Sequence, residues 1–232
     1  MVGLPYSMGG VAAVCDAILD GIFPPACIEC GKAGVWLCEE CLENIPLIGA
    51  VELPSENGSL DSLLAISVYQ NPVVGKYLRS LKYQRALCLV DEVGGALLRK
   101  FQVAFPRLLW EAPSLLVSLP MDPERKRVRG IDHAFELAKQ VQTSLFPDVP
   151  LKVALERTRT TEANARLRGA EARAGNIQGA LTCNADVQGQ DILLIDDVYT
   201  TGATMQEAAK VLKTAGAGSV HGLVFAASQG SA

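Results

Sequence analysis

The segment Ile192–Thr204, with the sequence ILLIDDVYTTGAT, constrains the fold more than any other part of the chain. Its first four residues are branched and apolar, which predicts a strand buried on both faces. Two acidic residues follow, and then a loop of small and hydroxyl residues that leads into a predicted helix. Ligands of open parallel sheets bind beyond the carboxyl ends of the strands, and helix N-termini bind phosphate. The segment therefore predicts a phosphate-binding loop beside two carboxylates at the edge of a parallel sheet.

Predicted strands and helices alternate along the chain, which indicates an α/β fold with a parallel sheet flanked by helices. Strands are expected at 63–69, 114–119, 152–155 and 220–227, and helices at 11–22, 73–81, 89–105, 133–145, 163–174 and 204–214. Residues 121–130 are expected to form a charged loop, and residues 46–61 a linker. We predict two domains: residues 1–61, with an N-terminal helix, a cysteine module and the linker, and residues 62–232, with the sheet.

The composition permits a packed core, because 49% of the 232 residues are hydrophobic and 20% are charged. No apolar run is long enough to span a bilayer. The first 22 residues are apolar but carry Asp16 and Asp20 and lack a basic start, which favours a packed helix over an export signal. We therefore expect a cytoplasmic protein, whose seven cysteines bind metal in preference to forming disulfides.

Charge is distributed unevenly around the net value of −4. Residues 1–61 hold nine acidic residues and one basic residue, whereas residues 121–173 hold eleven basic and eight acidic residues. A polyanion is therefore expected to meet the middle of the chain and to avoid its beginning.

Two closely spaced cysteine pairs, Cys27/Cys30 and Cys38/Cys41, are separated by seven residues. Each pair can present two thiolates to one ion, and four thiolates form the closed tetrahedral site of structural zinc. Gly31 and Gly34 lie where the chain must turn around the metal. Disulfides and an iron–sulfur cluster are the alternatives. The remaining cysteines, Cys15, Cys88 and Cys183, are expected to be small buried hydrophobic residues.

The acidic pair Asp196-Asp197 and the loop Thr200, Thr201, Gly202, Ala203 and Thr204 are the predicted ligand site. The alternative is that they only cap a turn and a helix, as such residues often do. Two adjacent carboxylates at the end of a buried strand repel each other and need partners. The loop has hydroxyl donors, a glycine and no bulky side chain, as a loop around phosphate oxygens requires. The chain contains neither a Walker A nor a dinucleotide-binding glycine motif.

This segment resembles the phosphoribosyl-pyrophosphate (PRPP) motif of type I phosphoribosyltransferases, which has four apolar residues, two acids and a Thr/Gly loop. The resemblance implies that Asp196 and Asp197 contact the ribose hydroxyls, directly or through Mg2+. It also implies that Thr200–Thr204 bind the 5'-phosphate.

Other features of the chain resemble the ComF family (ComFC/GntX-like), which is linked to competence and DNA utilisation. They are the preceding four-cysteine module, Tyr69 with Leu81-Lys82-Tyr83, the proline–arginine segment Leu119–Gly130, and Arg157, Arg159 and Thr161 followed by Arg173 and Asn176. The chain departs from the family pattern at two places. It has Ile131-Asp132-His133 where the family has an aromatic residue followed by Asn-Gln, and Asn164 where the family has Gln.

Arginines form two groups with different expected roles. Arg125, Arg127 and Arg129 follow a predicted strand end and suit a pyrophosphate, with a solvated loop as the alternative. Arg157, Arg159, Arg166, Arg168 and Arg173 can follow a nucleic-acid backbone, but acidic residues interrupt them and few aromatic residues are near. His133 is expected to be a helix cap or a surface residue.

Two functions follow from this interpretation. One is a Mg2+-dependent phosphoribosyltransferase that uses PRPP. The other is a non-catalytic PRPP- or nucleotide-binding accessory protein that binds single-stranded DNA during natural transformation, with DNA-uptake or recombination proteins as partners. A purely structural zinc adaptor leaves the Asp-Asp loop unexplained. Any hood over the site is expected to come from the N-terminal zinc region.

Overall fold

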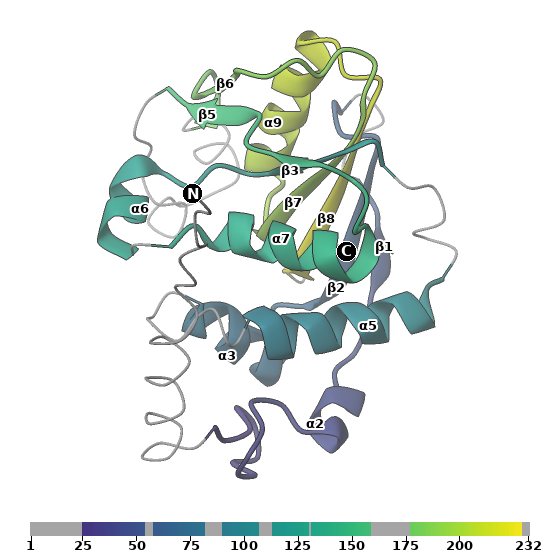
Figure 1. Cartoon of the computed structure of the whole chain (residues 1–232), viewed down its shortest axis with the longest axis vertical. Helices are drawn as coiled ribbons and strands as arrows, with labels where there is room; N and C mark the ends of the chain where they lie inside the picture. Colours follow the sequence, from purple (N-terminus) through teal and green to yellow (C-terminus); the bar gives the residue numbers. More distant parts are fainter. Residues whose placement is uncertain are drawn as a thin grey trace, which may run out of the picture.

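The computed structural model describes residues 25–53, 58–81, 90–106, 113–129, 131–158 and 177–228, and only the backbone of Arg125 and Arg129. Its main sheet has the strand order β1-β2-β8-β7-β3-β4 (Figure 1). The strands are β1 (Gly49–Val51), β2 (Ser62–Val68), β8 (Ser219–Ala227), β7 (Asp191–Tyr199), β3 (Leu115–Ser118) and β4 (Leu151–Lys152). All neighbours pair in parallel except β1, which runs antiparallel to β2. The predicted parallel sheet is therefore confirmed.

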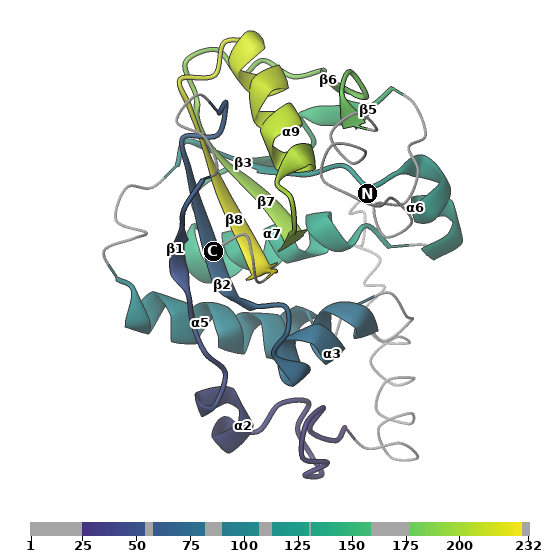
Figure 2. The same ribbon diagram turned by 180° about the vertical axis from the view of Figure 1, so that it is seen from behind.

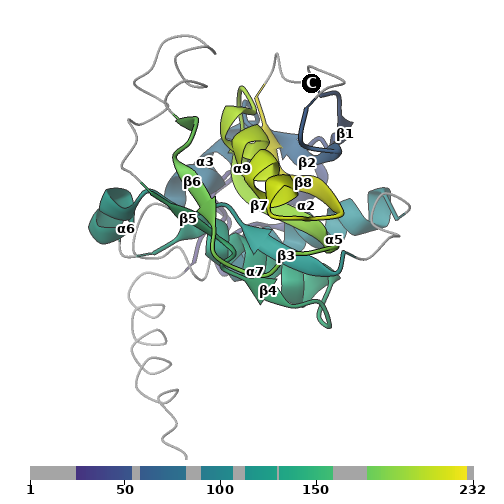
Figure 3. The ribbon, with the colours of Figure 1, turned by 90° about the horizontal axis from the view of Figure 1, so that it is seen from above.

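Helices cover both faces of this sheet. The helices α3 (Pro72–Ser80), α5 (Gly95–Ala104) and α7 (His133–Leu145) pack on one face, and α9 (Ala203–Thr214) packs on the other. Figure 2 shows the molecule from behind, and the view from above in Figure 3 shows α9 and α7 on opposite sides of the strands. Among the described helices, none is both long and apolar enough to cross a bilayer.

Strand β7 is buried on both faces because its apolar residues alternate between two cores. Leu193 and Ile195 belong to the core under α3, α5 and α7, whereas Ile192 and Leu194 belong to the core under α9. Successive side chains of a strand point to opposite faces, so a continuous apolar run fits a central strand between two helical layers. The local sequence thus accounts for the position of β7 inside the sheet.

The segment predicted as a linker, 46–61, contributes a strand to the sheet. Val51 is buried, and β1 pairs with β2 through Gly49↔Ala65 and Val51↔Leu63. Only the pairing with β2 gives this three-residue strand its partners, so its local sequence did not indicate it. The expected strand at 152–155 is also divided, because β4 ends at Lys152 and β5 (Leu155–Arg157) forms a separate antiparallel pair with β6 (Leu181–Cys183).

The segment predicted as a charged loop contains the helix α6 (Pro123–Arg129). Asp122 begins it, because its Oδ1 accepts a hydrogen bond of 3.0 Å from the backbone N–H of Glu124. Proline is favoured at the first helical position, where its missing N–H costs nothing. These residues form a helix start that the density of charge in the sequence concealed.

The expected helix 89–105 is present with a change of geometry at its glycine pair. Residues Val90–Gly94 (η1) form a π-helical turn, and α5 begins at Gly95. A Cβ atom at Gly94 would lie 2.6 Å from Oη of the buried Tyr77. A glycine is therefore required where the tyrosine of α3 meets this turn. The expected helices 11–22 and 163–174 lie outside the described residues.

Candidate functional site

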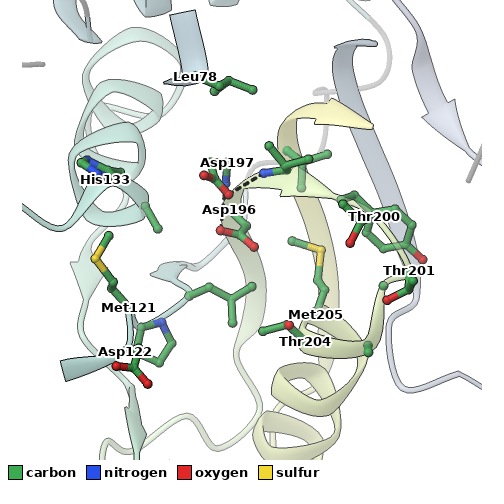
Figure 4. A pocket seen from close by; sticks show the side chains of 18 of the residues that line it. Leu78, Met121, Asp122, His133, Asp196, Asp197, Thr200, Thr201, Thr204 and Met205 are labelled. Atoms are coloured by element: carbon green, nitrogen blue, oxygen red, sulfur yellow. Dashed lines mark hydrogen bonds between the residues drawn. The ribbon is translucent and has the colours of Figure 1, made fainter. Parts of the chain in front are cut away.

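A cavity of about 380 Å³ opens at the carboxyl ends of the parallel strands. It is lined by Tyr69, Leu78, Leu119, Pro120, Met121, Asp122, His133, Ala134, Arg157, Asp196, Asp197, Val198, Tyr199, Thr200, Thr201, Gly202, Ala203, Thr204, Met205 and Val224. Figure 4 shows the acidic pair in the middle, with the threonines on one side and His133 on the other. The structure thus brings the predicted acidic pair and all five predicted loop residues to one cavity at the predicted edge of the sheet.

The end of β3 leaves room for the acidic pair. The last pair of β3 and β7 is Ser118↔Ile195, and the N–H of Leu119 donates to the carbonyl of Ile195 at 2.9 Å. Pro120 follows, which has no N–H to continue the ladder. Asp196 therefore extends beyond β3, while on its other side it still pairs with Val224 of β8.

The two carboxylates are held by the backbone of the residues that follow them. Asp196 Oδ1 accepts the N–H of Asp197 at 2.8 Å, and Asp197 Oδ1 accepts the N–H of Val198 at 2.7 Å. Burial raises the pKa of Asp196 well above its usual range, and the negative charge of Asp197 raises it further, against a smaller opposing effect of Arg157. A cation or several hydroxyl donors at this point would relieve the repulsion between the two carboxylates.

The loop turns into α9 at Gly202, which has φ +76° and ψ −8°. This left-handed backbone favours glycine. Gly202 offers no side chain to cap the first turn of α9, which leaves the N–H groups of that turn for a ligand. Helix α9 begins at Ala203, one residue before the predicted start. The local geometry therefore suits an anion beside the acidic pair.

His133 and Arg157 line the cavity, although the sequence did not indicate either as part of it. His133 is only 4% exposed, which corrects its expected position at the surface. The cap of α7 is Asp132, whose Oδ1 accepts the N–H of Phe135 at 3.4 Å. Spacing could have revealed the burial, because His133 lies one turn before the buried Leu137 of the same helix.

Arg157 reaches the cavity from β5 and donates from Nε to the carbonyl oxygen of Pro120 at 2.9 Å. It is the one member of the downstream basic block that falls within the described residues. Arg127, by contrast, is exposed on α6 and is not among the residues that line the cavity. The role of Arg125, Arg127 and Arg129 in binding pyrophosphate stays a prediction.

The four cysteines of the N-terminal module lie together, below α3 and α5 in Figure 1. Their sulfur atoms are all within 4.8 Å of one another, and Sγ of Cys30 and of Cys38 are 3.6 Å apart. Four sulfurs around a zinc ion at about 2.3 Å are roughly 3.8 Å apart, so the arrangement fits a tetrahedral metal ion. Gly31 and Gly34 have φ values of +76° and +89°, which confirms the predicted turns.

Thiolate formation is supported at Cys27. Burial acts to raise the pKa of this thiol, but hydrogen bonds from the backbone of Cys30, Cys38 and Glu29 lower it to about 6. The N–H of Cys38, for example, lies 3.5 Å from Sγ of Cys27. The fold thus prepares at least one metal ligand in its charged form.

The module is packed on the same core as the sheet. Ile45 is buried in the core under α3, α5 and α7, where Trp36 and Leu42 also pack. Lys100 of α5 donates from Nζ to the carbonyls of Leu42, Glu43 and Ile45 at 2.8, 2.8 and 2.7 Å. Within the described part of the chain, no residue of 25–53 lines the cavity.

Known proteins support the interpretation of the site. Residues 129–231, which include the acidic pair and the loop, match the family described as "Phosphoribosyl transferase domain". The DNA utilization protein YhgH of Escherichia coli (strain K12) is 25% identical over 223 residues, covering 94% of this chain and 91% of that protein.

Two further relatives match shorter segments. The competence protein ComFC of Bacillus subtilis (strain 168) is 30% identical over 121 residues, or 52% of this chain and 47% of that protein. A ribose-phosphate pyrophosphokinase of Wolinella succinogenes is 46% identical over 48 residues, or 21% of this chain and 16% of that protein. The resemblance to the ComF family is thus confirmed: the chain carries a phosphoribosyl transferase domain and is a relative of YhgH and ComFC.

Proposed function

We propose that the chain binds PRPP together with Mg2+ in the cavity at the carboxyl end of β7. One observation carries the proposal: Asp196, Asp197 and the whole loop Thr200–Thr204 line the same cavity. The acidic pair suits ribose hydroxyls or a cation, and the uncapped first turn of α9 suits a phosphate. The match of residues 129–231 to the phosphoribosyl transferase family supports the same ligand.

Each part of the cavity has a distinct task in this proposal. Backbone N–H groups at the start of α9 and the threonine hydroxyls hold the 5'-phosphate. Asp196 and Asp197 accept hydrogen bonds from the ribose hydroxyls or bind the Mg2+ shell. Mg2+, when bound, neutralises charge on the pyrophosphate. The raised pKa of Asp196 falls when a cation or hydroxyl donors arrive, so binding of the ligand favours the charged pair.

The proposed reaction is transfer of the phosphoribosyl group from PRPP to an acceptor with release of pyrophosphate. The protein would contribute mainly positioning and electrostatic stabilisation of the leaving group. Release of pyrophosphate from PRPP and Mg2+ across a panel of acceptors tests the reaction. PRPP binding without any release would support the alternative, an accessory protein that binds PRPP and transfers nothing.

Calorimetry on a paired substitution tests the binding site. We expect Asp196→Asn/Asp197→Asn to weaken the binding of PRPP with Mg2+ by about a hundredfold, as loss of two charge-assisted contacts implies. Asp148→Asn/Asp186→Asn is the matched control, because it removes the same charge from two exposed residues outside the cavity. Equal affinities in the wild type and the first variant would refute the proposed sugar site.

The names of the relatives point to a role in DNA utilisation and competence. We propose that the chain acts in the use of imported DNA, with single-stranded DNA and uptake or recombination proteins as partners in the cytoplasm. Direct binding of single strands should weaken steeply with salt, because it releases counterions. Binding that is absent or insensitive to salt would leave the phosphoribosyl ligand as the link to DNA metabolism.

Zinc is the metal that we propose for the four-cysteine site. Four thiolates within 4.8 Å satisfy a closed tetrahedral site and leave no coordination position for a substrate. The ion is therefore proposed to be structural. Elemental analysis of purified protein should find about one zinc per chain, and iron in its place would identify the other thiolate chemistry.

A further inference from the structure

The cavity has two walls of different chemistry (Figure 4). One wall holds the acidic pair and the loop Thr200–Thr204, where the sugar and its phosphate are proposed to lie. The other is mainly apolar and aromatic, and it is formed by Tyr69, Leu78, Met121, His133 and Ala134. A sugar phosphate at the first wall leaves the second for the group attached to the sugar.

His133 supplies hydrogen-bonding capacity to this second wall. It begins α7, and Figure 4 shows it across the cavity from Asp196 and Asp197. Burial of a polar side chain is uncommon here, since Ser67, Ser118, Asp122 and His133 are the buried polar residues of the described chain. The neutral imidazole has one donor and one acceptor nitrogen, which is enough to distinguish ligands by their own donors and acceptors.

The backbone at position 133 is anchored from both sides. Asp132 Oδ1 caps the first turn of α7, and its Oδ2 lies 3.6 Å from Nζ of Lys126. On the far side, Leu137 and Val141 of the same helix are completely buried. An anchored residue loses little entropy on binding a ligand, so its contact can contribute to selectivity.

We propose that His133 is a specificity-determining residue for a planar nitrogen heterocycle attached to the sugar, as in a nucleoside 5'-monophosphate. The flat ring would pack on Tyr69, Leu78 and Met121, and the imidazole would bind its polar edge. A mostly apolar wall with few polar groups is the usual composition of a site for such a ring. This proposal rests on the proposed sugar-phosphate site and adds what is bound beyond it.

Two substitutions separate hydrogen bonding from packing. His133→Gln retains a donor and an acceptor, and glutamine is the residue at the corresponding place of the ComF pattern. His133→Leu retains apolar bulk and removes both polar atoms. The affinity of each nucleoside monophosphate (AMP, GMP, CMP and UMP) is divided by the affinity of ribose 5-phosphate, so that the ratio reports the contact with the base alone.

We expect at least one nucleoside monophosphate to bind the wild type about tenfold more tightly than ribose 5-phosphate does. His133→Leu should remove most of that ratio, and His133→Gln should retain it within about threefold, with PRPP affinity unchanged in both. A ratio that His133→Leu leaves intact, or a wild type in which no base adds affinity, would overturn the proposal. Loss of PRPP and ribose 5-phosphate binding in the wild type would instead refute the sugar-phosphate site itself.

NMR of the imidazole groups provides a second test without substitution, because the chain has only two histidines. The other one, His221, lies 2.8 Å from Oγ of Ser62 near the opposite ends of the strands and serves as an internal control. The preferred nucleoside monophosphate should shift the signals of His133 and leave those of His221 in place. Identical spectra with this ligand and with ribose 5-phosphate would contradict the contact.

Discussion

The phenol of Tyr199 fills the space that a side chain at Gly202 would need. A Cβ atom at Gly202 would lie 2.6 Å from Cζ and 2.8 Å from Cε2 of Tyr199, and still nearer to its hydroxyl oxygen. Tyr199 is the last residue of β7 and is 3% exposed. The strand therefore supports the ligand loop from below, and the glycine is required by both its backbone conformation and this contact.

We predict that Gly202→Ala weakens PRPP binding by at least about tenfold and lowers the free energy of unfolding by about 1–3 kcal/mol. The added methyl group collides with the Tyr199 ring and displaces the loop. Calorimetry and urea unfolding measure the two effects. Gly189→Ala is the matched control, because Gly189 has a φ of +67° with no atom within 4 Å of an added Cβ. Equal effects of the two substitutions would show that backbone strain alone is responsible.

Tyr199→Phe should leave the protein as stable as the wild type or make it more stable by up to about 1 kcal/mol. The hydroxyl of Tyr199 is buried without a hydrogen-bond partner in the described part of the chain, so its removal abolishes a desolvation cost. Tyr77→Phe, which removes the other such tyrosine hydroxyl, should behave in the same way. A loss of stability in urea would reveal a partner for the phenol.

Asp196→Asn should stabilise the free protein at alkaline pH while it weakens ligand binding. Because its pKa is raised in the folded state, Asp196 holds a proton there at pH values where it is ionised in the unfolded chain. Its contribution to stability therefore decreases as pH rises from the ordinary aspartate pKa through the raised one. We expect the variant to be more stable by about 1 kcal/mol near pH 8, with a smaller difference near pH 5.

Urea unfolding at the two pH values measures this effect. Asp186→Asn provides the control at an exposed carboxylate outside the cavity. A wild type that is more stable than Asp196→Asn at the higher pH would show that the folded protein favours the charged form.

Lys100→Met should lower the free energy of unfolding by about 1–3 kcal/mol, because three backbone carbonyls lose a charged donor. These carbonyls belong to Leu42, Glu43 and Ile45, at the end of α2 (Glu39–Glu43) and just beyond it. Lys139→Met, which removes an exposed ion pair with Glu136, should change stability by less than about 0.5 kcal/mol. Similar effects in both variants would argue against the role of Lys100 as a clamp.

Removal of metal by a chelator should lower the thermal unfolding midpoint by about 5 °C, because the four-cysteine segment then loses its main source of stability. Affinity for PRPP below that midpoint should change by less than about threefold, since no described residue of 25–53 lines the cavity. Cys27→Ser/Cys30→Ser should be insensitive to the chelator. A large loss of PRPP affinity would show that the metal centre also shapes the site.

Strong local patterns predicted much of the fold. The apolar run at 192–195, the helical periodicity of 133–145 and the paired cysteines each involve residues close in sequence, and β7, α7 and the four-cysteine cluster appeared where expected. Elements that depend on distant partners were missed, namely β1 and the pairing of β5 with β6. Their short sequences contain too little periodicity to indicate a strand.

The sequence by itself determined which groups bind the proposed sugar and phosphate, because Asp196, Asp197 and the loop are consecutive and carry their own geometry. Only the tertiary structure decided what faces them. His133 and Arg157 come from different elements, and they meet the acidic pair because β3 ends early and α7 packs beside β7. A wall assembled from separate segments leaves no local pattern, so the character of the second half of the cavity emerged from packing alone.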